Sequence, residues 1–182
     1  MLGRPPFLSE DFADLEFAQT LSDQDITPSS ISRTSKGIEC LVTASILHVQ
    51  FARSVRQASK DQHMLYQVSE EKQFQTAARL NAEIARWHGE LPIFLSGAIN
   101  PASLIPVFRR QIIVLRMGQA RAIMLVNRPL ILSRCAPLAA IRPHVEEFLS
   151  AAKQMLEMVL DFVADNRLFQ GFLKTQMCSI SA

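Results

Sequence analysis

One stretch constrains the fold of this chain more than any other: residues 104–127, which are apolar on nearly every side of a helix. Side chains at steps of three and four share one face there, namely Ile105, Phe108, Ile112, Leu115, Gln119, Ala122 and Val126. Further apolar residues occupy much of the remaining circumference: Ile113, Val114, Met117, Met124 and Leu125. A helix of this kind is buried on several sides. The sequence therefore predicts a multi-helix bundle with residues 104–127 at its centre.

Local signals predict where this central helix begins, ends and is approached by a neighbour. Ser103 can cap its start, and Pro106 falls in the tolerant first turn. Pro129 is expected to end it, because a proline drives the preceding residue out of the α region. Gly118 lies in mid-helix, where glycine costs about 0.5–1 kcal/mol relative to alanine. We expect a neighbouring helix to approach closely at this glycine and at Ala122, one turn further on.

Two amphipathic helices are predicted before the central one. The first spans about 32–59, with a buried stripe of Ile38, Leu41, Val42, Ile46, Val49, Ala52 and Val55 or Arg56. Residues 60–68 are predicted to be a polar break. The second helix spans about 69–89, with helical spacing of Ala77, Leu80, Ile84, Trp87 and Leu91, and ends at Gly89 and Pro92. Residues 93–103 are predicted to be a loop, and Trp87 a core anchor buried against the central helix.

After the central helix, the pattern predicts one long helix and the beginning of another. The long helix spans about 143–164, starts at Pro143, and has a buried stripe of Val145, Phe148, Leu149, Ala152, Leu156, Val159 and Val163. Residues 168–180 are apolar enough to begin a further packed helix. No segment alternates as a strand does, so the class is all-α. We expect one domain over 1–182, irregular over 1–31 and helical over 32–182.

The sequence offers no recognisable catalytic or metal-binding motif, so we assign no catalytic, cofactor-binding or metal site residues. Cys40, Cys135 and Cys178 are scattered and odd in number, which favours a reducing compartment over a disulfide scaffold. The CxxC, HxxxH, HExxH, GxSxG and Gly-rich phosphate-binding patterns are missing. Hydrophobic residues make up 48% and charged residues 20% of the chain, which is typical of a core-rich globular protein. No apolar run has the length of a membrane span.

Arginines around the central helix are the one charge asymmetry. Six of them, with no acid between residues 104 and 134, are Arg109, Arg110, Arg116, Arg121, Arg128 and Arg134. They suit a surface that contacts phosphates. They equally suit a core helix whose arginines extend to water and pair with acids at 10–16 or on the 143–164 helix. The second reading fits so apolar a helix better, and the net charge of +2 gives nucleic acid binding no further support.

Three ordered strings resemble the regulatory domain of fungal transcription factors, known as the middle homology region and as the xylanolytic-activator type. Leu2 to Pro6, followed by acidic residues, is similar to its LGRP segment. Ile84 to Pro92 is similar to its W…LP helix end, and Met124 to Leu130 to its helix end LL-x-RP. Residues 148–160 and 172–182 resemble the helices that follow.

The resemblance implies a function, a partner and a compartment. Members of this family carry a binuclear zinc cluster that binds DNA in the nucleus, and the all-α domain regulates that module. Three scattered cysteines cannot form the cluster, so we expect a partial domain without zinc, enzymatic activity or DNA-reading surface, which contacts DNA only through a separate zinc-cluster module. Exposed apolar faces would favour protein partners or self-association, with no membrane partner. The alternative hypothesis is a helical small-molecule-binding or protein-interaction domain unrelated to transcription.

Overall fold

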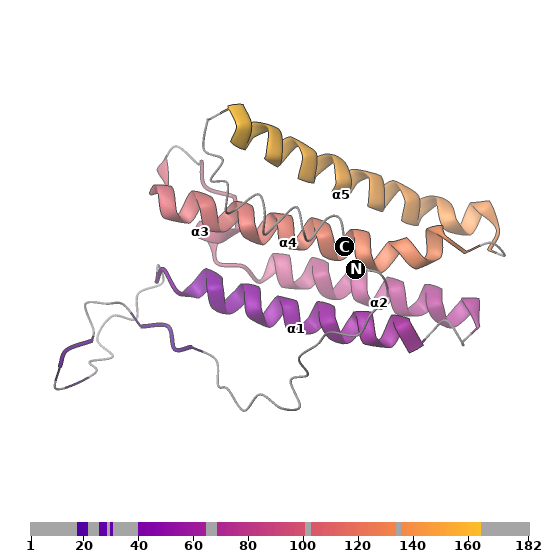
Figure 1. Cartoon of the computed structure of the whole chain (residues 1–182), viewed down its shortest axis with the longest axis horizontal. Helices are drawn as coiled ribbons and strands as arrows, with labels where there is room; N and C mark the ends of the chain where they lie inside the picture. Colours follow the sequence, from indigo (N-terminus) through magenta and orange to yellow (C-terminus); the bar gives the residue numbers. More distant parts are fainter. Residues whose placement is uncertain are drawn as a thin grey trace.

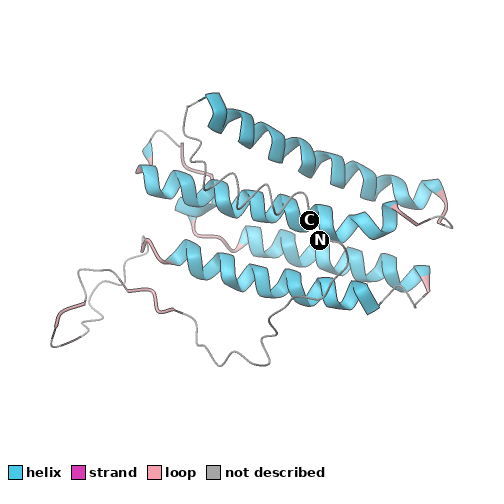
Figure 2. Cartoon of the chain, in the orientation of Figure 1, coloured by secondary structure: helices cyan, strands magenta, loops and turns pink. Residues whose placement is uncertain are grey.

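The computed structural model describes residues 18–21, 26–28, 30, 40–64, 69–100, 103–133 and 136–164. Five helices are formed in these ranges: α1 (Thr43–Met64), α2 (Glu70–Gly89), α3 (Ile93–Ser96), α4 (Pro106–Ile131) and α5 (Leu138–Ala164). The described residues contain no β-strand, and Figure 2 shows helices joined by short loops. The predicted all-α class is therefore confirmed. The expected helix at 168–180 and the irregular segment at 1–17 lie outside the described residues.

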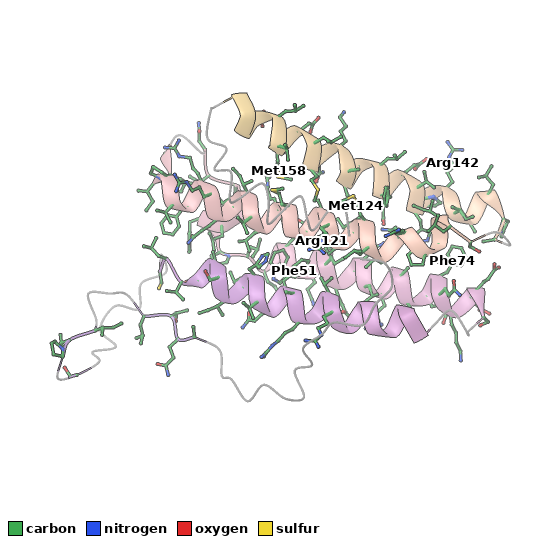
Figure 3. The ribbon with its side chains drawn as sticks, in the orientation of Figure 1. Phe51, Phe74, Arg121, Met124, Arg142 and Met158 are labelled. Carbon is green, nitrogen blue, oxygen red and sulfur yellow. The ribbon has the colours of Figure 1, made fainter. Side chains whose placement is uncertain are left out.

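Helix α4 is the centre of the bundle, as its apolar circumference predicts. It contacts α1, α2 and α3 on one side and α5 on the other (Figure 1). Toward α1 and α2 it presents Ala122, Val126 and Leu130, each at most 2% exposed. Toward α5 it presents Met117 and Ala120, which pack against Ala151 and Met155. Figure 3 shows Met124 and Met158 in the seam between these two helices.

The close approach expected at Gly118 is observed. A Cβ atom added at this glycine would lie 3.4 Å from Cε1 of His48 and 4.0 Å from Cδ1 of Phe51, both on α1. Helix α1 therefore packs directly onto the backbone of α4 at this position. A second glycine, Gly97, ends α3 in the left-handed conformation with φ of 83°. The guanidinium of Arg116 on α4 covers Gly97, with carbon Cζ 3.1 Å from the place of a Cβ atom.

The two prolines predicted to bound helices lie inside them. Helix α4 continues through Pro129 to Ile131, and α5 begins at Leu138, five residues before Pro143. Each proline lies within about a turn and a half of a helix end, so it removes one hydrogen bond from a terminal turn. In α4 that turn also carries Leu130, which is 2% exposed and anchored in the core. Burial of the last turn thus outweighs the steric preference of the residue before proline.

Three further boundary predictions were wrong. Helix α1 begins only at Thr43, after non-helical residues 40–42 that the prediction had included, and it runs on to Met64 through most of the expected polar break at 60–68. Residues 93–96 of the expected loop form α3, in which Phe94 and Leu95 are buried. Ser103 does not cap α4, because the capping residue is Ile105, whose side chain cannot accept a hydrogen bond. Ile105 itself is 52% exposed and belongs to none of the core clusters.

The buried stripes of α2 and α4 follow the prediction, and those of α1 and α5 do not. On α2, Ala77, Leu80 and Ile84 are buried as expected. Among the α1 side chains whose burial is described, Ala44 and Phe51 are buried and Val49 is 47% exposed; Leu41, just before α1, is 48% exposed. Among those described on α5, Ile141, Ala151 and Met155 are buried, and the predicted Leu149 and Leu156 face solvent. Helices α1 and α5 are apolar over a wide arc, so the spacing of apolar residues alone did not predict which face packs against the core.

Candidate functional site

A cleft between α1 and α2 is a candidate ligand site in the described part of the chain. Its volume is about 190 Å³, below the roughly 300–1,000 Å³ typical of ligand pockets. Apolar side chains from three helices form most of the lining, and charged side chains complete it: Phe51, Val55, Leu80, Glu83, Ile84, Arg86, Trp87, Glu90 and Val126. The cleft therefore suits a small apolar group, or one flat ring with a polar substituent.

Trp87 forms part of this cleft and joins two regions of the core. Its ring stacks on Phe51, with centroids 4.0 Å apart and 23° between the ring planes. It packs against the core cluster around Val126 and Leu130, and also against the cluster around Phe94 and Phe108. The predicted role as a core anchor is confirmed, with two differences: the ring is only partly buried, and its stacking partner lies on α1. Its Nε1 is buried without a hydrogen-bond partner.

A polar network joins α2, α4 and α5 around Asn127, a fully buried residue. Its Oδ1 accepts hydrogen bonds from Nδ1 of His144 at 2.7 Å and from Nδ2 of Asn81 at 3.2 Å. Because an amide oxygen only accepts, His144 must carry a proton on Nδ1. Nδ2 of Asn127 donates to the carbonyl of Ile123 at 2.8 Å. Glu147 accepts from Asn81 at 2.7 Å and from Asn127 at 3.3 Å.

The polar network is arranged to hold helices together, and its geometry is not that of a catalytic centre. Asn127 has its donors and acceptors occupied by protein groups, which leaves them no capacity for a substrate. Of the two titratable residues in the network, His144 and Glu147, the second is exposed and accepts hydrogen bonds from two amides. The ring of His144 also packs on Phe74 of α2, with centroids 5.4 Å apart. The network therefore fixes α5 against α2 and α4.

A second polar feature lies where α1 meets Gly118. Nδ1 of His48 and Nε of Arg121 are both buried without hydrogen-bond partners. Burial lowers the pKa of His48 below its ordinary value of 6.5, and the positive charge of Arg121 lowers it further. Burial also lowers the pKa of Arg121. Figure 3 shows Arg121 between α4 and α1, near Phe51. At neutral pH this region therefore holds one positive charge, on Arg121, and a neutral imidazole.

The arginines of the central helix do not gather into one surface. Arg121 is directed toward α1, and Arg116 covers Gly97 at the α3 end. Nε of Arg109 donates to the carbonyl of Leu104 at 2.9 Å, while Arg110 and Arg128 are exposed. Four i, i+4 ion pairs, two at α2 and two on α5, involve none of this set, and no pairing of its described arginines with acids of α5 is observed. Arg134 and the acids at 10–16 lie outside the described ranges.

The structure groups none of the cysteines and histidines into a metal site within its described residues. Cys40 is buried as a free thiol, and its Sγ lies 3.2 Å from the carbonyl of Leu21. Cys135 and Cys178 fall outside the described ranges. Among the helices that are described, none combines the length and hydropathy needed to cross a membrane.

Comparison with protein-family models, with curated proteins and with solved structures gives no match for this chain. The candidate sites are therefore argued from their own geometry. Trp87 at a helix end was a usable sequence signal for the cleft, whereas the sequence-based prediction did not single out Asn127. No sequence signal indicated the joining of Asn127 to His144, because that contact depends on the direction in which α5 crosses α4.

Proposed function

We propose that this chain is a regulatory domain of a fungal zinc-cluster transcription factor, acting in the nucleus on a DNA-binding module outside this chain. In this proposal the domain has no catalytic residues of its own. It alters the output of the DNA-binding module by inhibiting it, by sensing an effector or by contacting another protein. DNA is contacted only through that module, which would also hold the zinc ions.

The observation that carries the proposal is the meeting of two family-like strings in one core cluster. Trp87 belongs to the string 84–92 at the end of α2, and Val126 and Leu130 belong to the string 124–130 at the end of α4. The Trp87 ring packs against the cluster that contains these two residues. Asn127, in the second string, forms a hydrogen bond with His144 of α5. Strings with such structural roles are the kind that a family's fold would preserve.

A reporter assay tests this proposal. The chain is inserted between a heterologous DNA-binding domain and a strong activation domain in fungal cells, and reporter output is compared with that of the same fusion without the chain. We expect the insertion to change the output several-fold at equal protein level. Equal outputs from the two fusions would contradict a regulatory role.

A second candidate function, small-molecule binding unrelated to transcription, is favoured by the cleft beside Trp87. This residue is the one tryptophan of the chain, so its fluorescence reports on the cleft without interference. Titration with small planar aromatic compounds should quench the emission saturably if the cleft binds them. The matched control is Phe51→Leu, which removes the stacking wall and should weaken such binding. Saturable quenching together with an inactive reporter fusion would favour this second function.

A further inference from the structure

Helix α5 carries two apolar stripes, and α4 covers only one of them. The covered stripe contains Ile141, Ala151 and Met155, which are 8%, 2% and 6% exposed. The second stripe faces away from the bundle, and three of its leucines, Leu138, Leu149 and Leu156, are 81%, 59% and 64% exposed. Isolated exposed leucines are common on proteins, but a continuous row along one helix indicates an interaction surface.

The outward stripe has the spacing of a coiled-coil seam. Leu149 and Leu156 are seven residues apart, and Leu138, Val145 and Ala152 form a parallel row with the same seven-residue step. The two rows alternate at steps of three and four, which is the a/d pattern that packs one helix against another. From Leu138 to Leu156 the pattern spans about 27 Å of helix at 1.5 Å per residue, with Arg142 at the seam position one turn after Leu138. This stripe therefore fits one partner helix of similar length.

The charges beside the stripe indicate which helix that is. Glu146 and Lys153 border it on the same side, seven residues apart. Each pairs within α5, Glu146 with Arg142 at 3.0 Å and Lys153 with Glu157 at 3.9 Å, and their side chains remain 66% and 77% exposed. If a second α5 runs antiparallel about a two-fold axis near residues 150 and 151, Leu149 meets Ala152 of the other copy and Val145 meets Leu156. Glu146 then lies opposite Lys153 of the other copy, and the two-fold axis forms this pair twice. In a parallel arrangement Glu146 lies level with Glu146 of the other copy and Lys153 with Lys153, so the Glu146–Lys153 pairs are lost.

We propose that the outward stripe of α5 (Leu138, Val145, Leu149, Ala152 and Leu156) is a homodimerisation surface at which two copies of this chain pair through antiparallel α5 helices. The small residue Ala152 opposite Leu149 permits close approach at the centre. The short stripe and two symmetric ion pairs give a small interface, so association depends on protein concentration. This inference is independent of the proposed role in transcription.

Sedimentation velocity of the full chain across about a hundredfold range of concentration tests the dimer. The wild type should shift from monomer to dimer as concentration rises. The double variant Leu149→Glu/Leu156→Glu should remain monomeric with unchanged circular dichroism, because both leucines are exposed in the monomer. The matched control Leu132→Glu alters a leucine that is 63% exposed outside α5 and should dimerise as the wild type does.

A charge exchange tests the antiparallel direction. Lys153→Glu places like charges opposite Glu146 and should weaken the dimer at least several-fold, and Glu146→Lys/Lys153→Glu should restore it. A wild type that is monomeric throughout would overturn the proposal. So would a stripe variant that loses its helical signal, because another part of the same chain would then cover the stripe. Failure of the charge exchange to restore association would overturn the antiparallel pairing.

Discussion

Removing the side chain of Asn127 should loosen α5 from the rest of the bundle more than any change at the surface of α5. Asn127→Ala deletes an acceptor shared by His144 and Asn81 and a donor to the carbonyl of Ile123. These three hydrogen bonds measure 2.7, 3.2 and 2.8 Å, so all are well formed. At a net contribution of about 1 kcal/mol each, their loss amounts to roughly 3 kcal/mol.

Two corrections to this sum have opposite signs. Glu147 is exposed and Asn81 is partly exposed, so water can replace part of the hydrogen bonding to Asn127 that these two residues lose. The fully buried space left by the deleted amide adds a cavity cost in the other direction. We therefore expect a loss of about 2–4 kcal/mol in the free energy of unfolding. The control Asn81→Ala removes a partner near the surface and should cost about 1 kcal/mol.

Urea unfolding followed by circular dichroism measures the total loss, and hydrogen exchange locates it. In Asn127→Ala the amides of α5 should exchange faster relative to those of α2, because the network is what joins these helices. A loss below about 1 kcal/mol would refute the inference that this network fixes α5. A uniform rise in exchange over all helices would refute the assignment of the effect to α5.

Three further predictions concern the contact between α1 and the other helices. Gly118→Ala should stabilise the protein by about 0.5–1 kcal/mol, because the new Cβ meets His48 at an ordinary contact distance and helix propensity improves. Gly118→Leu should instead destabilise it by about 1–3 kcal/mol. Urea denaturation measures both changes in the free energy of unfolding. Phe51→Ala should cost about 3–5 kcal/mol and shift the Trp87 emission to the red, while a solvent-like emission maximum already present in the wild type would contradict the stacking. The lowered pKa of His48 means that the unfolded chain binds a proton more readily than the folded one, so this group's contribution to stability is complete above pH 6.5 and declines as pH falls below that value. Urea midpoints at pH 7.5 and 5.5 should therefore differ less in His48→Phe than in the wild type, and an equal difference would exclude His48 as the cause.

The sequence predicted those parts of the fold that depend on one helix at a time. The apolar circumference of residues 104–127 identified the central helix, and the narrow stripe of Ala77, Leu80 and Ile84 identified the buried face of α2. In the first case the pattern is compatible with one choice of central helix, and in the second with one choice of buried face. The approach of α1 at Gly118 was also predictable, since a glycine in the middle of a helix costs stability unless packing uses it.

The parts of the fold that the sequence did not predict depend on how the helices pack against one another, which the spacing of apolar residues alone does not determine. Helix α5 is apolar over a wide arc, and the prediction buried Leu149, whereas the structure buries Ala151. Its direction across α4 is fixed partly by His144 and Asn127, whose contact spans two helices. Pro129 and Pro143 were read as helix boundaries from local sterics, but tertiary packing of the adjoining turns overrides that preference. The cleft beside Trp87 likewise exists only once α1 and α2 lie together.

Two variants in the reporter fusion test whether the folded bundle regulates an attached DNA-binding module. Leu115→Asp places a charge at a residue that is 1% exposed at the centre of α4 and should unfold the bundle. Leu132→Asp makes the same change at a residue that is 63% exposed and should leave the fold intact. At equal protein levels, the account predicts that Leu115→Asp abolishes the effect of the inserted chain on reporter output and that Leu132→Asp preserves it. An effect that survives Leu115→Asp unchanged would contradict regulation by the folded bundle.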